Sequence, residues 1–100
     1  MAVEKIPEQD LASLVDDLNG RGPGGWTAED GKLRKTLLFP DFVTAFGFMA
    51  KVAIIAEKKN HHPEWFNVYN KIIIGLSSHD VGGISERDFE LAEAIDRLIL

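Results

Sequence analysis

The chain has 100 residues, 45% of them hydrophobic and 27% charged, proportions typical of a globular protein rather than a disordered or fibrous one. At this length, residues 1–100 are expected to form a single domain around one core. The formal net charge of −5 argues against direct nucleic-acid binding, which needs clustered Lys and Arg, and the lack of cysteine excludes disulfides, thiolate nucleophiles and Cys-based zinc sites.

The N-terminal segment does not have the pattern of a secretory signal. Residues 1–10 carry acidic side chains and Pro7 in place of a basic patch followed by an apolar run. No apolar stretch along the chain approaches the length needed to span a membrane. We therefore expect a cytoplasmic protein without membrane contact.

The first 40 residues predict a helix followed by a β-hairpin. Pro7 suits a first helical position, and apolar residues recur at helical spacing up to Leu18, before Asn19-Gly20 is expected to stop the helix. After a Gly-rich loop, Trp26 is expected to open a strand that turns at Asp30-Gly31 and returns over residues 32–39.

A long second helix is predicted over residues 42–59, with Asp41 as its N-cap. Its apolar residues cover roughly two-thirds of the circumference, well beyond the ~100° stripe that one core requires. One face carries Phe42, Phe46, Met49, Ala53 and Ala56, and the adjoining face carries Ala45, Phe48, Val52 and Ile55. We expect the first face to meet the core and the second, with Phe48, Val52 and Ile55, to be covered by another copy in a homodimer or homotetramer.

The remaining residues predict a second hairpin and a third helix. Strands are expected over 65–68 and 71–77, joined by a tight turn at Tyr69-Asn70. Ser85 and Asp88 resemble a capping box for a helix that continues to the C-terminus. The predicted fold class is α+β, a two-layer sandwich with three helices on one face of a four-stranded antiparallel sheet, in the order α-β-β-α-β-β-α.

All three histidines fall within residues 57–88, and two of them are adjacent. Pro63 forces His62 out of helical geometry, so the rings of His61 and His62 are expected to leave the helix end in different directions. His79 lies in a strand-to-helix loop, where Gly82-Gly83 is expected to let the backbone approach a ligand closely. The free N–H groups at the start of the third helix are expected to favour a ligand's carbonyl oxygen. Imidazoles in such a pattern suit acid/base chemistry near neutral pH.

Two simpler interpretations compete with a histidine active site. A lone histidine is usually structural or solvated, but this interpretation is less convincing for three histidines in one short stretch. A zinc site would use imidazole ligands, but no cysteine is available and His61 and His62 would be strained to face one ion, so no metal is expected. A carboxylate is stabilising near any helix N-terminus, so the presence of Asp88 at the start of the third helix does not by itself indicate a function.

Several of these segments resemble the pterin-4a-carbinolamine dehydratases, whose animal members also serve as dimerisation cofactors of a homeodomain transcription factor. The likeness is carried by residues 61–70, by Ser78-His79-Asp80 with Gly82-Gly83, and by residues 85–88, and it extends over nearly the whole chain. Two departures are Asn60, where many relatives have Asp, and Ser78, where many have Thr.

The resemblance implies a lyase that removes water from 4a-hydroxytetrahydropterin to give quinonoid dihydropterin in tetrahydropterin recycling, without cofactor or metal. It implies that His61 and His79 act as acid and base and that His62 mainly holds the pterin. It also implies contacts to the pterin from Glu57, Asn60, Pro63, Ser78, Asp80 and Val81. The alternative function is a protein-binding module that acts through the second helix, with a transcription factor as its partner.

Overall fold

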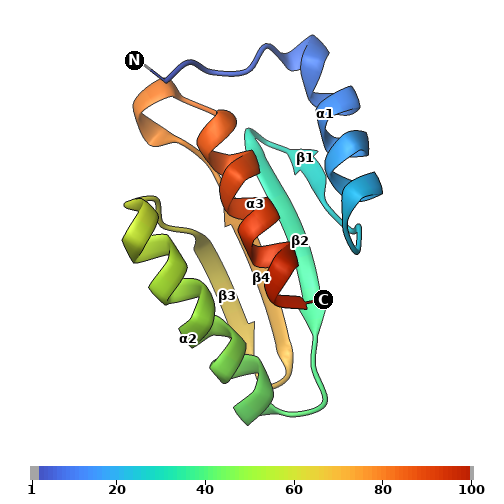
Figure 1. The fold of residues 1–100 in the computed structure, drawn as a ribbon, viewed down its shortest axis with the longest axis vertical. Helices are drawn as coiled ribbons and strands as arrows, with labels where there is room; N and C mark the ends of the chain where they lie inside the picture. Colours follow the sequence, from blue (N-terminus) through green and yellow to red (C-terminus); the bar gives the residue numbers. More distant parts are fainter. Residues whose placement is uncertain (1–2, 100) are drawn as a thin grey trace.

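The computed structural model describes residues 3–99, which form three helices and a four-stranded antiparallel sheet. In chain order the elements are α1 (Glu8–Arg21), β1 (Thr27–Glu29), β2 (Lys32–Leu38), α2 (Phe42–Lys59), β3 (Glu64–Val68), β4 (Lys71–Leu76), the 3₁₀ turn η1 (His79–Val81) and α3 (Glu86–Ile99). The predicted α+β order is confirmed (Figure 1). No helix within residues 3–99 is long and apolar enough to cross a membrane.

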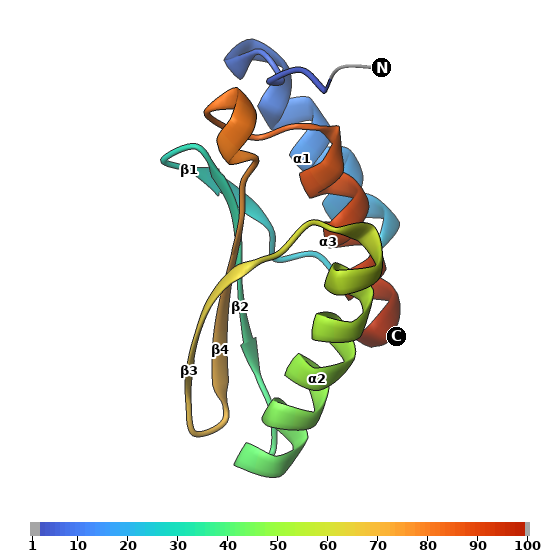
Figure 2. The same cartoon turned by 90° about the vertical axis from the view of Figure 1, so that its left-hand side faces the viewer.

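The sheet has the order β1-β2-β4-β3, and all its neighbours are antiparallel. Successive side chains of a strand point to opposite faces, so Ile72, Ile74 and Leu76 of β4 lie on one face together with Leu33 of β2, and all four are buried. Figure 2 shows the three helices on one side of the sheet, which confirms the two-layer arrangement. The core lies between these layers.

The first helix is longer than predicted, and the first strand begins later. Helix α1 continues through Asn19-Gly20 to Arg21. The Asn19 side chain donates to the carbonyl oxygen of Trp26 and accepts from its N–H, both at 2.9 Å. These bonds give Asn19 a tertiary role that offsets its weak helix propensity, and they occupy the Trp26 backbone, so β1 begins only at Thr27.

Helix α2 has the predicted bounds, and Asp41 caps it by accepting a hydrogen bond from the Thr44 N–H at 2.7 Å. The predicted orientation was wrong. Ala45, Phe48, Val52 and Ala56 face the core, whereas the exposed large apolar residues of α2 are Phe42, Val43, Phe46 and Ile54. A helical projection identifies two adjoining apolar faces, but it does not determine which of them the sheet covers.

Candidate active site

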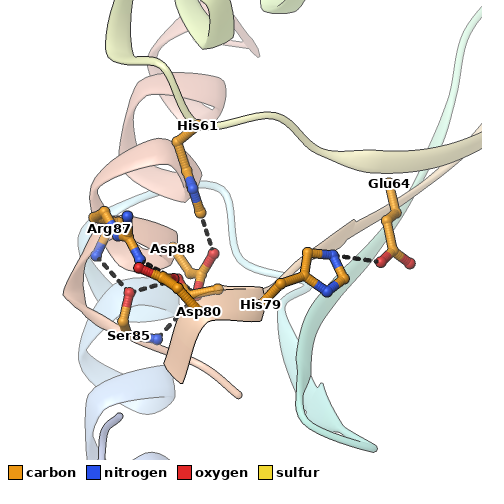
Figure 3. Close-up of polar contacts among 8 residues, drawn as sticks. His61, Glu64, His79, Asp80, Ser85, Arg87 and Asp88 are labelled. Carbon is orange, nitrogen blue, oxygen red and sulfur yellow. Dashed lines mark hydrogen bonds and ion pairs between the residues drawn. The ribbon is translucent and has the colours of Figure 1, made fainter. Parts of the chain in front are cut away.

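Two loops meet at one end of the sheet because of the pairing of β3 with β4. Glu64 at the start of β3 lies opposite Gly75 near the end of β4. The segment of His61, His62 and Pro63, which leads into β3, therefore lies beside the segment that leaves β4 and carries His79. Figure 3 shows His61 and His79 reaching into this region from the two loops.

The ring of His61 is held by a buried carboxylate. Its Nε2 lies 2.5 Å from Oδ1 of Asp88, and the side chains of His61 and Asp88 are 11% and 0% exposed. Figure 3 shows the His61 ring pointing at this carboxylate. Asn60 sets the direction of the chain just before this ring, because it ends α2 in the left-handed conformation, with φ of 53°. Asparagine adopts this conformation more readily than most residues.

Asp88 belongs to the first turn of α3, where it receives two further hydrogen bonds. Its Oδ2 accepts from the Ser85 N–H and from the Ser78 hydroxyl, both at 2.9 Å. The Ser78 and Ser85 hydroxyl oxygens lie 2.6 Å apart, and the Arg87 N–H donates to the Ser85 hydroxyl at 3.2 Å. The predicted capping box is therefore present.

This capping arrangement occupies two of the N–H groups that were expected to favour a ligand's carbonyl oxygen. The N–H groups of Ser85 and Arg87 are both occupied by side chains of the same turn. Ser78, one of the predicted pterin contacts, is only 1% exposed, and its hydroxyl donates to Asp88 inside the protein.

His62 leaves the end of α2 in another direction from His61. Its Nε2 lies 2.8 Å from Oε1 of Glu57, on the last turns of α2, and both side chains are largely exposed. The two adjacent imidazoles therefore pair with different elements, His61 with α3 and His62 with α2. Glu57, for which the resemblance implied a contact to the pterin, is paired with the His62 ring in this structure.

His79 is the most exposed of the three histidines, with 84% of its side chain accessible. Its Nε2 lies 3.5 Å from Oε1 of Glu64. Figure 3 shows the two side chains facing each other. The other oxygen of Glu64 accepts from Lys32 Nζ at 2.6 Å. This hydrogen bond is the main cause that lowers the pKa of Glu64, which keeps its carboxylate ionised beside His79.

The remaining predicted site residues lie around the same two loops. Asp80 forms an ion pair with Arg87, and the hydrogen bond from this guanidinium lowers the pKa of Asp80. Val81 completes η1 and is half-buried, as is Pro63 just before β3.

The glycine pair makes a turn and a close approach inside the protein. Gly82 ends η1 at a positive φ of 71°, which glycine adopts without strain. A Cβ atom at Gly83 would lie 2.8 Å from Cε of Lys5. The close approach therefore serves the N-terminal segment, whose Ile6 N–H donates to the Ile84 carbonyl oxygen at 2.8 Å.

Comparison with known proteins finds relatives that match most of this chain. The family model for pterin 4 alpha carbinolamine dehydratase matches residues 4–98. The chain belongs to this family. A relative from Solibacter usitatus, provisionally named pterin-4-alpha-carbinolamine dehydratase, is 47% identical over 94 residues. The matched residues make up 94% of this chain and 94% of the relative. One of the same provisional name from Burkholderia vietnamiensis is 56% identical over 75 residues, which cover 73% of this chain and 74% of the relative.

A solved structure confirms the fold of this dehydratase. The crystal structure of a transcriptional coactivator/pterin dehydratase from Brucella melitensis matches with a TM-score of 0.84 and 36% identity, over 95% of this chain and 98% of the other. The resemblance stated from the sequence and the enzyme class that it implied, a dehydratase, are thus confirmed.

The candidate site contains one carboxylate to which the sequence assigned no function. Asp88 was expected only to stabilise a helix N-terminus, yet it is fully buried and bonded to His61. The capping-box pattern was the available signal. It predicted the contact with Ser85, but nothing in local spacing predicts that a histidine 27 residues away reaches the same carboxylate.

Proposed function

We propose that this chain dehydrates 4a-hydroxytetrahydropterin to quinonoid dihydropterin by histidine acid/base catalysis, in tetrahydropterin recycling. The observation that carries the proposal is the pairing of His61 with the buried Asp88, at the same end of the sheet as His79. A carboxylate that orients an imidazole is the arrangement by which many enzymes prepare a histidine for proton transfer.

The reaction needs two proton transfers and no change of oxidation state. The C4a–O bond breaks as a proton is delivered to the departing hydroxyl, which leaves as water. A proton is lost from the adjacent ring nitrogen, and its electron pair forms the new double bond to C4a. Imidazole exchanges protons near neutral pH, and a positioned group of this kind contributes ~10²–10⁴-fold. His61 and His79 are the proposed acid and base.

The other residues are proposed to hold the pterin ring between the two loops. His62 is the main binding residue, because its ring is exposed and fixed by Glu57. Asp80 offers a carboxylate that Arg87 keeps ionised, which suits the N–H donors of a pterin. Asn60, Pro63, Ser78 and Val81 are proposed to shape the loop backbone around the ring.

An assay of carbinolamine dehydration with single histidine variants tests this assignment. His61→Ala and His79→Ala are each expected to lower kcat by about 10²-fold or more, because each removes a proton-transfer group. His62→Ala is the matched control, and it is expected chiefly to raise KM. Wild-type activity in the His61→Ala, His79→Ala double variant, with an unchanged circular dichroism spectrum, would contradict the acid/base proposal.

We also propose that the exposed face of α2 is an interface with a second copy, in a homodimer or homotetramer. Phe42, Val43, Phe46 and Ile54 expose apolar surface there, and burying a large apolar side chain contributes ~1.5–3 kcal/mol. A symmetric contact lets this face cover its own copy. The same face supports the alternative function, a protein-binding module, which gains weight if the pure chain is monomeric. The relative from Brucella melitensis is called a transcriptional coactivator/pterin dehydratase, a name that joins both activities for that protein.

Two further expectations complete the proposal. Residues 1–100 act as one domain, and the protein works in the cytoplasm on a pterin substrate, without a cofactor and without binding nucleic acid.

A further inference from the structure

A chain of hydrogen bonds leads from the backbone of α3 to Asp88, and the His61 ring meets the same carboxylate at its other oxygen. Ser78 donates its only hydroxyl proton to Oδ2 of Asp88. In its 2.6 Å contact with Ser85, Ser78 can therefore only accept, so the Ser85 hydroxyl is the donor. The Ser85 oxygen in turn accepts from the Arg87 N–H.

The two oxygens of Asp88 then differ in what surrounds them. Oδ2 already accepts from two donors, the Ser78 hydroxyl and the Ser85 N–H. Oδ1 has His61 Nε2 at 2.5 Å. The first turn of α3 also favours negative charge at this position. The two fixed donors at Oδ2 and the helix N-terminus both favour the ionised form, and an ionised carboxylate can only accept.

The two nitrogens of the His61 ring have equally different surroundings. Nε2 faces the carboxylate and must carry a proton in order to donate to it. Nδ1 makes no hydrogen bond to any of residues 3–99, and it is not among their buried unpartnered atoms. Nδ1 is therefore the nitrogen that solvent or a ligand between the two loops can reach.

We propose that Ser78 and Ser85 are positioning residues that fix neutral His61 as the Nε2–H tautomer, so that Nδ1 exchanges the proton with substrate. This inference rests on the proposed acid/base function and names the atom through which His61 acts. Neither serine touches the substrate through its hydroxyl, since they are 1% and 0% exposed. Their effect passes through Asp88, because the chain from Ser85 through Ser78 ends on Oδ2 and fixes the orientation of the carboxylate, which keeps Oδ1 facing His61.

Without the two hydroxyls, Asp88 keeps the Ser85 N–H and His61 as its donors. Its Oδ2 then has one donor in place of two, and the carboxylate is free to rotate. Rotation moves Oδ1 away from the direction of His61 Nε2 and releases the ring to adopt either tautomer. The serines therefore act on the proton position and the orientation of His61, and hardly on the affinity for a pterin.

The first measurement needs no substrate. Two-bond ¹H–¹⁵N correlation spectra of the ¹⁵N-labelled full chain at neutral pH report which nitrogen of His61 carries the proton. We expect the Nε2–H tautomer in the wild type and a mixture in Ser78→Ala. Finding Nδ1–H as the main wild-type tautomer would overturn the proposal, because Asp88 would then be the donor. This outcome leaves the dehydratase assay, and hence the proposed function, unaffected.

The second measurement is steady-state dehydration by serine variants. Ser78→Ala is expected to lower kcat roughly 10-fold and to change KM less than about twofold. The expected fall in kcat is the size that the loss of one hydrogen bond to a charged group would give. Ser85→Ala is expected to lower kcat by roughly 3-fold to 10-fold, because Asp88 keeps the Ser85 N–H.

Two further variants separate this role from a merely structural one. Ser78→Thr keeps the hydroxyl and is expected to restore kcat to within about threefold of the wild type. Ser77→Ala removes a neighbouring hydroxyl that makes no hydrogen bond to residues 3–99, and it is expected to leave kcat unchanged. Equal kcat values for Ser77→Ala and Ser78→Ala, or a Ser78→Thr variant as slow as Ser78→Ala, would overturn the positioning role.

Discussion

Replacing Asp88 with asparagine removes one charge from the site while keeping the shape of the side chain. The amide has one acceptor oxygen and one donor NH₂ group in place of two acceptor oxygens. At the Oδ2 position two donors already converge, so the amide oxygen is expected to stay there. The NH₂ group then faces His61 Nε2, which must become an acceptor. The proton of the ring moves to Nδ1, the nitrogen proposed to work on the substrate.

The size of each effect follows from these contacts. Hydrogen bonds to charged groups contribute ~1.5–3 kcal/mol, and neutral ones ~0.5–1.5 kcal/mol. The two bonds at Oδ2 each lose about 1 kcal/mol, so the free energy of unfolding should fall by about 2 kcal/mol. The loss of activity should be larger, because the imidazole is left in the wrong tautomer. We expect kcat to fall by ~10²–10⁴-fold, the full contribution of a general acid or base.

The assays are urea unfolding for stability and carbinolamine dehydration for kcat. Asp10→Asn is the matched control, since it makes the same change in the first turn of α1, where the carboxylate is exposed. It should lower stability by less than about 1 kcal/mol and leave kcat unchanged. An Asp88→Asn variant that keeps a third or more of wild-type kcat would refute the role given to the His61–Asp88 pair.

Three further predictions concern metal, assembly and charge. Activity should survive exhaustive chelation because cysteine ligands are absent, and a tightly bound metal in each chain, lost together with activity, would contradict this. Phe46→Glu should lower the mass of the assembly measured by light scattering, whereas Phe48→Glu should destabilise the fold because Phe48 is buried. A wild-type chain that sediments as a monomer at high micromolar concentration would contradict the interface. Lys32→Met should raise the pKa of Glu64 towards its ordinary value in a ¹³C NMR titration, because the hydrogen bond that lowers it is lost. Since the folded-state pKa is the lower one, the stability from this pair is present above the unfolded-state pKa of Glu64 and disappears as the pH falls through the folded-state value.

The fold was predictable from local signals because most of its elements are bounded by residues with strong conformational preferences. Asp41 caps α2, and the turns at Asp30-Gly31 and Tyr69-Asn70 close the two hairpins, as predicted. The prediction failed where tertiary contacts decide. Asn19 remains helical because its side chain binds the Trp26 backbone, a contact between residues seven positions apart.

The candidate site was predictable in its residues more than in its arrangement. The three histidines and their flanking residues were identified from sequence and resemblance. Spacing does not reveal which side chain faces the interior, so Ser78 was expected at the pterin and not behind Asp88. The role of Gly83 was missed for the same reason, since its neighbour Lys5 is distant in the sequence.

The position of Asp88 links the folding of α3 to the assembly of the site. A capping side chain ordinarily contributes ~1 kcal/mol and can be replaced by another cap with little consequence. Here the same carboxylate that accepts from the Ser85 N–H also holds His61, which arrives from the end of α2. Fraying of the first turn of α3 would therefore release the imidazole, even though the two residues lie 27 positions apart. Substitutions that only weaken the cap should therefore lower activity in proportion to the fraction of molecules in which this turn is frayed. A capping box that holds no active-site residue would not link helix stability to activity in this way.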